Sequence, residues 1–183
     1  MRILILNGSP RKNGNTELLA KAFAKGAEEN NEVEIVNVAE LNISPCRGCN
    51  YCCAAGDGKC AQKDDMTMIY ERLMRTDMLV LASPVYFYGI SAQLKTVIDR
   101  LHTPMRSSFP LSRLGLLLVG AAELPEMFDS ILTQYRLALN FFKLEDVGMV
   151  LARGERERGS VEGSAAIEEA FALGRSIKQE EEK

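Results

Sequence analysis

All five cysteines of this 183-residue chain fall in one short window, at positions 46, 49, 52, 53 and 60. Cys46, Cys49, Cys52 and Cys60 follow the spacing C-x2-C-x2-C-x7-C, and the first three copy the start of the C-x2-C-x2-C-x3-C run that ligates iron–sulfur clusters. The window therefore predicts a metal site with thiolate ligands. Zinc is an alternative, although zinc sites more often use two separated C-x2-C pairs. A set of reduced thiols that bind nothing is the third interpretation.

The distribution of cysteine and histidine narrows the chemistry further. A secreted scaffold would spread its cysteines to connect distant segments, whereas here none lies outside the window. The chain has one histidine, His102, which excludes zinc sites built on two histidines and leaves any Ser-His-Asp triad dependent on that residue. A histidine in this place, just past a predicted helix, is more often a capping or surface residue.

A second candidate site is the segment Gly8–Thr16, which reads GSPRKNGNT after a short apolar run. No Lys-Ser/Thr pair follows Gly14, so the segment is not a Walker loop, and it lacks the G-x-G-x-x-G fingerprint of dinucleotide sites. It carries Arg11 and Lys12 and leads into a predicted helix, whose first N–H groups and dipole favour an anion. It is thus typical of a phosphate site, with a plain capped turn as the alternative. The side-chain donors are Ser9, Asn15 and Thr16.

A third candidate site is the segment Ser83–Gly89 (SPVYFYG), which has three consecutive aromatic residues. Neighbouring side chains of a loop point in different directions and are hard to bury together, so a flat aromatic ligand stacked here would explain them. The alternative is packing against the next helix or a partner subunit. The segment Gly120–Leu124 (GAAEL) adds small residues where the edge of a ring can approach the backbone.

Alternating strands and helices position these segments. Apolar or alternating runs predict strands at Arg2–Leu6, Val33–Val38, Met78–Ala82, Leu114–Val119 and Val147–Leu151. Helical spacing of apolar residues predicts helices at Asn15–Glu29, Asp64–Arg75, Ser91–Leu101, Pro125–Phe142 and Val161–Ile177, the first capped by Asn15.

Three of these strands are almost wholly apolar, which predicts a parallel sheet covered by helices on both faces. The expected fold is a flavodoxin-like, doubly wound α/β domain with five strands in the order 2-1-3-4-5. In such sheets ligands bind at the carboxyl ends of the strands, where all the candidate segments begin.

The chain is expected to form one domain over residues 1–183, since no repeat or linker divides it. Residues 39–63 form its longest loop and carry every cysteine, and loops of this length in compact domains are usually functional or disordered. Residues 179–183 (QEEEK) are expected to be a solvated tail.

Composition excludes several classes of protein. A net charge of −3 provides no basic excess for nucleic-acid binding. The longest apolar run, Leu114–Ala122, is shorter than the roughly 20 residues that span a bilayer, and the apolar run at Ile3–Leu6 is too short for a signal peptide. We therefore expect a cytoplasmic protein with no membrane partner.

Three segments together resemble one protein family. They are GSPRKNGNT, CRGCNYC followed by a later cysteine and KDDM, and SPVYFYGISAQLKTVIDR. The chain resembles the NADPH-dependent FMN reductase family and looks most like the iron–sulfur flavoproteins of anaerobes, over residues 1 to about 102.

The resemblance implies non-covalently bound FMN, with a 4Fe–4S cluster on Cys46, Cys49, Cys52 and Cys60 near the flavin. It places the phosphate on Ser9, Arg11, Asn13, Asn15 and Thr16. It places the isoalloxazine on Pro84, Val85, Tyr86, Phe87, Tyr88 and Gly89. FMN is favoured over FAD because no second fingerprint for an adenosine half is present.

The expected function is an FMN-dependent oxidoreductase that passes electrons from NAD(P)H or a protein donor through FMN to an acceptor. No side chain is assigned as an acid or base, because the flavin carries the chemistry at N5. An electron carrier with a 4Fe–4S cluster, or a zinc-stabilised interaction module, is the alternative. The resemblance also implies a homodimer or homotetramer.

Overall fold

A parallel sheet forms the centre of the computed structural model, which describes residues 1–178. Its strands are β1 (Arg2–Asn7), β2 (Glu32–Asn37), β3 (Met78–Tyr86), β5 (Arg113–Val119) and β6 (Glu145–Ala152). They lie in the order β2-β1-β3-β5-β6, which is the expected 2-1-3-4-5 when the parallel strands alone are counted. The sequence did not predict the short β4 (Gly89–Ile90), which pairs antiparallel with the end of β3. The predicted tail at 179–183 lies outside the described residues.

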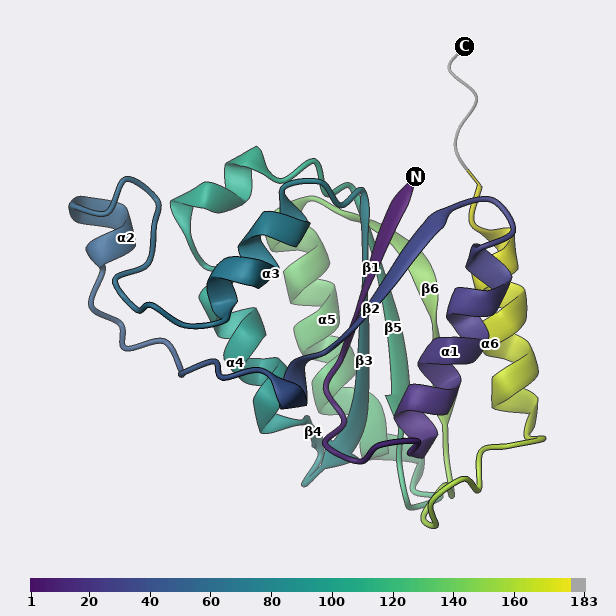
Figure 1. Ribbon diagram of the computed structural model, residues 1–183. Coiled ribbons are helices and arrows are strands. Elements are labelled where there is room, and N and C mark those ends of the chain that lie inside the picture. The colour runs from purple at the N-terminus through teal and green to yellow at the C-terminus, as the bar shows by residue number, and fades with distance from the viewer. Residues whose placement is uncertain (179–183) are drawn as a thin grey trace.

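Helices cover both faces of this sheet (Figure 1). The helices are α1 (Asn15–Ala27), α3 (Met66–Leu73), α4 (Ala92–Arg100), α5 (Asp129–Phe142) and α6 (Ala165–Ser176). One face packs against α1 and α6, and the other packs against α3, α4 and α5. The four-residue α2 (Tyr51–Ala54) projects away from the sheet.

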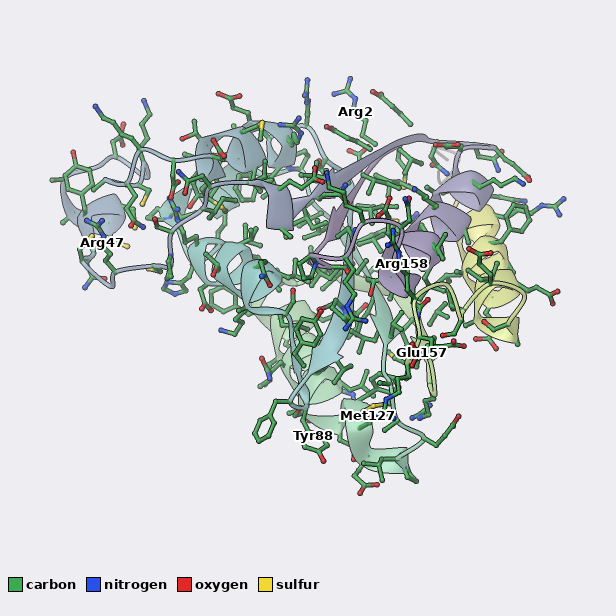
Figure 2. The ribbon with its side chains drawn as sticks, turned by 60° about the horizontal axis from the view of Figure 1, so that its bottom comes forward. Arg2, Arg47, Tyr88, Met127, Glu157 and Arg158 are labelled. Atoms are coloured by element: carbon green, nitrogen blue, oxygen red, sulfur yellow. The ribbon has the colours of Figure 1, made fainter. Side chains whose placement is uncertain are left out.

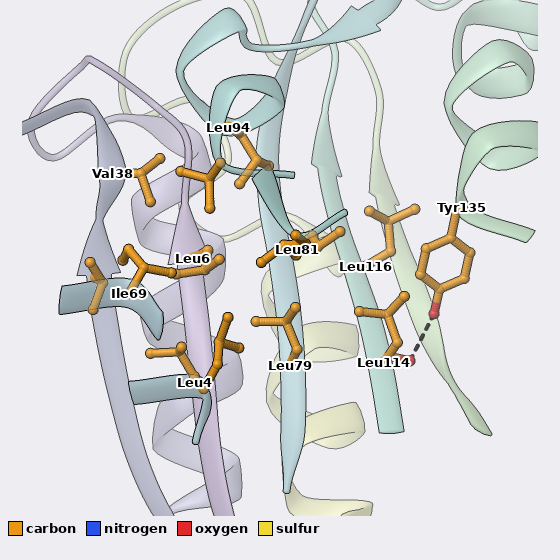
Figure 3. Packing of buried hydrophobic residues seen from close by; sticks show 14 of the residues in the cluster. Leu4, Leu6, Val38, Ile69, Leu79, Leu81, Leu94, Leu114, Leu116 and Tyr135 are labelled. Carbon is orange, nitrogen blue, oxygen red and sulfur yellow. Dashed lines mark hydrogen bonds between the residues drawn. The ribbon is translucent and has the colours of Figure 1, made fainter. Parts of the chain in front are cut away.

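The apolar strands explain the two layers of core. Along β1, Leu4 and Leu6 face the α3 side while Ile3 and Ile5 face α1, so the strand is buried on both faces. Figure 3 shows the first layer, in which leucines of β1, β3 and β5 pack under α3, α4 and α5. The Tyr135 hydroxyl donates a 2.8 Å hydrogen bond to the Leu114 carbonyl, so the one buried phenol of this view is satisfied.

Glycine allows α1 and α6 to cross at close range. A Cβ atom on Gly26 would lie 2.1 Å from the Phe171 carbonyl oxygen, and one on Gly174 would lie 2.1 Å from that of Phe23. The helices therefore touch backbone to backbone toward their C-terminal ends.

Most helices are shorter and most strands longer than the periodicity predicts. The last helix begins at Ala165 rather than Val161, because Gly159 and Gly163 adopt positive φ values and turn the chain first. The helix expected from Pro125 starts as a 3-10 turn, Pro125–Phe128, before α5. Among residues 1–178, no helix has the length and apolar character needed to cross a bilayer.

Candidate functional site

A pocket of about 250 Å³ opens at the carboxyl edge of the sheet. It brings together the segment after β1, the end of β3 and the segment after β5, as the topology requires. From the predicted sites the lining residues are Ser9, Arg11, Asn15, Thr16, Pro84, Val85 and Tyr86. Gly14, Val119 and Ala121 complete these walls. The other predicted site residues do not line the pocket; they are Asn13, Phe87, Tyr88 and Gly89.

Local hydrogen bonds shape the first loop, residues 8–16. The side-chain oxygen of Asn7 accepts from the Ser9 N–H at 3.2 Å, and the Ser9 hydroxyl accepts from the Arg11 N–H at 3.2 Å. Asn13 has a φ of 50°, which asparagine tolerates, and its N–H donates to Glu17 at 2.6 Å. These bonds fold the loop back on itself and direct it into α1.

Glu17 is held ionised at this turn. Burial raises the pKa of its carboxyl, but the ammonium of Lys21, 2.6 Å away, and the Asn13 N–H together hold that pKa below its usual value. The carboxylate is therefore engaged on the helix side of the loop rather than in the pocket.

The first turn of α1 faces the pocket without a side-chain cap. Gly14 is the N-cap, not Asn15 as the sequence suggested, and glycine has no side chain that could accept a hydrogen bond from the first turn. Because Gly14, Asn15 and Thr16 line the pocket, the positive end of a 13-residue helix is directed at it. Thr16 is 2% exposed and adds a hydroxyl there. The arrangement is suited to an anion.

Asn15 does not cap the helix because its side chain holds a segment 140 residues later in the chain. Its amide NH2 donates to the carbonyls of Glu155 (3.1 Å) and Glu157 (2.8 Å) and to the Ser160 hydroxyl (3.1 Å). Its oxygen accepts from the Gly159 N–H at 2.8 Å. The amide is thus already engaged, and it connects the first loop to residues 153–160.

The predicted aromatic loop is a β-hairpin. β3 continues to Tyr86 and turns into β4, with Val85 opposite Ile90 and Tyr86 opposite Gly89. Phe87 and Tyr88 form the turn with φ values of 49° and 63°, a strained conformation for aromatic residues. Figure 2 shows Tyr88 at this tip, and the Phe87 side chain is 98% exposed.

The hairpin is attached to the fold on both sides. The Ser130 hydroxyl of α5 donates to the Tyr88 carbonyl, and the Ser83 hydroxyl accepts from the Ser91 N–H at 2.9 Å. The pocket therefore has a fixed aromatic wall, while the side chain of Phe87 stays in solvent.

The cysteine segment, residues 39–63, leaves the fold and returns at a narrow neck. The Asn42 N–H donates to the Asp65 carboxylate at 2.7 Å, and the Asp65 N–H donates to the Asn42 carbonyl at 3.2 Å. The Ser44 N–H donates to Asp64 at 3.0 Å. The two ends of the segment are thus bonded to each other, although the segment between them projects from the molecule (Figure 1).

A buried ion pair holds this neck against α4. The Arg100 guanidinium binds the Asp64 carboxylate and donates to the Ser44 carbonyl at 3.2 Å, with the two side chains 2% and 8% exposed. Burial raises the pKa of Asp64, but Arg100 and the Ser44 N–H hold it below its usual value. Sequence reasoning missed this pair. The available signal was an arginine three residues after Val97, on the buried face of the helix.

The cysteines themselves lie in the projecting part of the segment. Cys46, Cys49 and Cys53 are exposed, Cys52 and Cys60 are partly buried, and the thiols of Cys52 and Cys53 lie 3.9 Å apart. Cys52 and Cys53 both lie in the helical turn α2. Within residues 1–178, no three Cys, His, Asp or Glu side chains are arranged to hold a metal. The thiol-only donor set nevertheless suits an iron–sulfur cluster chemically.

A larger cavity, of about 650 Å³, lies between α3 and residues 59–65. Cys60, Tyr70 and Met105 line it, and it shares no lining residue with the pocket at the sheet edge. Burial raises the pKa of Tyr70 to about 12, and its hydroxyl donates to the Arg100 carbonyl at 2.8 Å. This phenol therefore stays protonated and supports the neck. His102 stacks on Phe141 at the surface, with ring centroids 5.7 Å apart.

Comparison with known proteins gives matches along most of the chain. Residues 1–153 match the model of the NADPH-dependent FMN reductase family. An iron–sulfur flavoprotein of Methanocaldococcus jannaschii is 42% identical over 125 residues, which cover 67% of this chain and 63% of that protein. The chain thus spans less than two thirds of the first curated relatives that it matches.

Solved structures share the fold at lower identity. An NAD(P)H:quinone oxidoreductase from Methanothermobacter marburgensis superposes with a TM-score of 0.75 at 16% identity, covering 100% of this chain and 99% of that one. An FMN-dependent NADH-azoreductase of Bacillus anthracis, solved in complex with FMN, gives 0.67 at 14% identity with 96% of each chain covered.

Most of the pocket is built from the residues that match the family model. The first loop, the aromatic hairpin and the segment after β5 all lie within residues 1–153. The expected topology is present in the described structure. The chain belongs to the NADPH-dependent FMN reductase family.

Proposed function

We propose that this chain is an FMN-dependent oxidoreductase that passes electrons from NAD(P)H or a protein donor through FMN to an acceptor. One observation carries the proposal: a single pocket joins the uncapped start of α1 to an aromatic hairpin. The first wall suits a phosphate and the second suits a flat ring, which are the two ends of FMN.

The residues present fit FMN. Ser9, Arg11 and Thr16 offer hydroxyl and guanidinium donors beside the helix N-terminus, and Asn13 shapes the loop that carries them. Pro84, Val85 and Tyr86 give the ring a fixed wall, with Phe87, Tyr88 and Gly89 forming the turn that holds this wall in place. Ala121 leaves room beside it for a ring edge.

The chain's own residues bind, orient and shield the cofactor. FMN, when bound, supplies hydride acceptance at N5 and delivery of electrons singly or in pairs. Pro84, Val85 and Tyr86 would hold the ring and shield one side of it from water. No acid or base is assigned, because the flavin carries the chemistry, and the carboxylate in the lining, Glu155, accepts a hydrogen bond from the Ser160 hydroxyl.

Cofactor analysis tests the first part of the proposal. Purified protein is denatured and the released flavin is separated by chromatography. We expect FMN, since the first loop leads directly into a helix and suits a terminal phosphate. Mainly FAD, or no flavin after reconstitution, would contradict it.

Electron transfer from nicotinamide tests the second part. Anaerobic addition of NADPH or NADH to FMN-loaded protein is expected to bleach the flavin absorbance, with turnover when a quinone or oxygen is supplied. Protein that binds FMN but is reduced only by a protein donor would support the electron carrier instead.

The cysteine segment supports a second candidate function, an electron carrier that holds a 4Fe–4S cluster on Cys46, Cys49, Cys52 and Cys60. Its support is the thiol-only donor set and the names of relatives such as the M. jannaschii iron–sulfur flavoprotein. Iron content and visible absorption after anaerobic purification test it. Zinc without iron would favour a zinc-stabilised interaction module.

We also propose a cytoplasmic homodimer or homotetramer. The free thiols suit a reducing compartment, and the exposed Phe87, Leu137 and Phe141 offer apolar surface for a second copy. Light scattering at several protein concentrations measures the assembly, and a monomer at all of them would contradict it.

A further inference from the structure

The pocket has a fourth wall that the predicted sites did not include. Residues 153–160 (RGERERGS), which we call the arginine loop, follow β6 and lead toward α6. Glu155, Arg156 and Arg158 of this loop line the same pocket as Ser9 and Thr16. Figure 2 shows Glu157 and Arg158 at this edge of the molecule.

The arginine loop is held in place rather than free. Its start is bonded to the segment after β5, with the Gly154 N–H donating to Ala122 at 3.2 Å and the Glu155 N–H donating to Gly120 at 3.0 Å. Its centre and end are bonded to the buried Asn15, whose amide contacts residues 155–160 through both its nitrogen and its oxygen. The loop therefore has a defined position over the first turn of α1.

Positive charge collects where the two loops meet. Arg11, Arg156 and Arg158 all line the pocket, and Arg158 donates to the Asn13 carbonyl at 3.5 Å. Within the described chain, the guanidinium groups of Arg11 and Arg156 have no hydrogen-bond or ion-pair partner. The lining thus carries the guanidinium groups of Arg11, Arg156 and Arg158 against the carboxylate of Glu155, which accepts a hydrogen bond from the Ser160 hydroxyl at 2.5 Å. Glu17, at the start of α1, is paired with Lys21.

We propose that Arg156 and Arg158 bind the phosphate of FMN together with the first loop, and that Asn15 is the positioning residue that holds them there. The inference rests on the proposed function, because it takes FMN as the ligand. Guanidinium groups bind a phosphate dianion strongly, and here they line the same pocket as the helix N-terminus that already favours one. The loop after β6 thus contributes to a site that the sequence predicted from the segments after the first and third strands.

The test compares FMN with riboflavin, which has the same ring and no phosphate. Affinities of apoprotein for both ligands are measured by quenching of flavin fluorescence. Arg156→Gln and Arg158→Gln are each expected to weaken FMN binding about tenfold, which is at the low end for a charge-assisted bond, and to leave riboflavin binding unchanged. The control is Arg136→Gln, which removes an equal charge from the exposed side of α5 and should change neither affinity.

A double-mutant cycle tests the role of Asn15. Asn15→Ala is expected to weaken FMN binding about tenfold in the wild-type background, with little effect on riboflavin. In the Arg156→Gln/Arg158→Gln background, the same change should add little further loss, because the groups that Asn15 positions are gone. A merely structural role would give the same loss in both backgrounds.

The outcomes separate this inference from the proposed function. Wild-type protein that binds neither flavin would overturn the proposed function itself. Wild-type protein that binds FMN, with arginine variants that bind it equally well, would overturn the role of the arginine loop alone. Equal losses of FMN and riboflavin affinity would also overturn it, since the arginines would then act on the ring or on folding.

Discussion

Thr16 provides the most direct test of the phosphate end at the scale of a single residue. Its hydroxyl lies in the first turn of α1, in a side chain that is 2% exposed and lines the pocket. Thr16→Val keeps the shape and removes the donor, and a hydrogen bond to a charged group contributes about 1.5–3 kcal/mol. We expect FMN affinity to fall about tenfold or more, measured by fluorescence titration.

Thr133→Val on α5 is the matched control, because that threonine is exposed and its hydroxyl donates to the Asp129 carbonyl of its own helix. Its FMN affinity should equal that of the wild type. An unchanged affinity in Thr16→Val, with the control behaving as expected, would mean that the phosphate lies elsewhere.

The cysteines give a second prediction at this scale. If four thiolates hold one cluster, serine at each of Cys46, Cys49, Cys52 and Cys60 removes or destabilises the same iron signal, because thiolate is the preferred ligand. Cys53→Ser should retain it, and flavin content should persist in all five variants. Iron content and absorption spectra of anaerobically purified protein check this. Because the Cys53 thiol lies 3.9 Å from that of Cys52, this variant tests the spacing itself, and loss of the iron signal in Cys53→Ser would contradict the four-cysteine assignment.

The sequence indicated which residues come together in the pocket better than it indicated what each of them does there. Ser9, Arg11 and Thr16 lie where the sequence placed them, in one pocket with Tyr86. Asn15 lies there too, but its amide bonds to a loop more than 140 residues away. No local pattern contains that contact, because it depends on α6 returning next to α1.

At the scale of elements, the neck of the cysteine segment depends on a buried charge. Asp64→Asn leaves the Arg100 guanidinium without its carboxylate in a buried site, and breaking such pairs costs about 3–5 kcal/mol. We expect a lower free energy of unfolding in urea by about that amount. FMN affinity should be unchanged, because no residue of the neck lines the pocket at the sheet edge.

A second substitution makes this prediction specific. Arg100→Met in the Asp64→Asn background removes the unpaired charge and should recover part of the lost stability. A double variant as unstable as Asp64→Asn alone would show that the neck is held by its backbone hydrogen bonds instead. The pair had no sequence signature as strong as an apolar strand, because a single arginine on a helix is usually solvated.

The parallel sheet was predictable because the central strands are almost wholly apolar, as in a sheet covered by helices on both faces. The aromatic hairpin was not predictable from the sequence. Two-residue hairpin turns favour asparagine or glycine, whereas this turn uses Phe87 and Tyr88 at positive φ. Tertiary attachment by Ser83 and Ser130 holds a turn that local preferences oppose.

For the molecule as a whole, the depressed pKa values of Asp64 and Glu17 predict sensitivity to acid. A carboxyl whose pKa is lower in the folded state stabilises the protein above its unfolded pKa, here near 4, and loses that contribution as pH falls through the folded value. The urea midpoint should therefore hold between about pH 7 and 5 and drop below about pH 4. Asp64→Asn should show a shallower drop, and an equally steep one would assign the acid sensitivity to other carboxyls.

The architecture of the whole domain followed from its sequence because alternation of strands and helices admits few right-handed windings. What the sequence could not provide was the position of the cysteine segment relative to the pocket. The segment projects on one side of the chain while the arginine loop lies on another, as Figures 1 and 2 agree. That separation depends on how the long segment at residues 39–63 packs, and the hydrophobic periodicity of the sequence does not encode this packing.

Because Asn42 and Asp65 are bonded to each other, the cysteine segment between them can be replaced as one unit. Its two ends are already neighbours, so residues 45–63 can be exchanged for a short linker without any strand changing its partner. One deletion there removes all five thiols and leaves the residues of the parallel strands and of the pocket at their carboxyl edge in place. The same geometry offers engineers a place to graft other redox groups onto this scaffold.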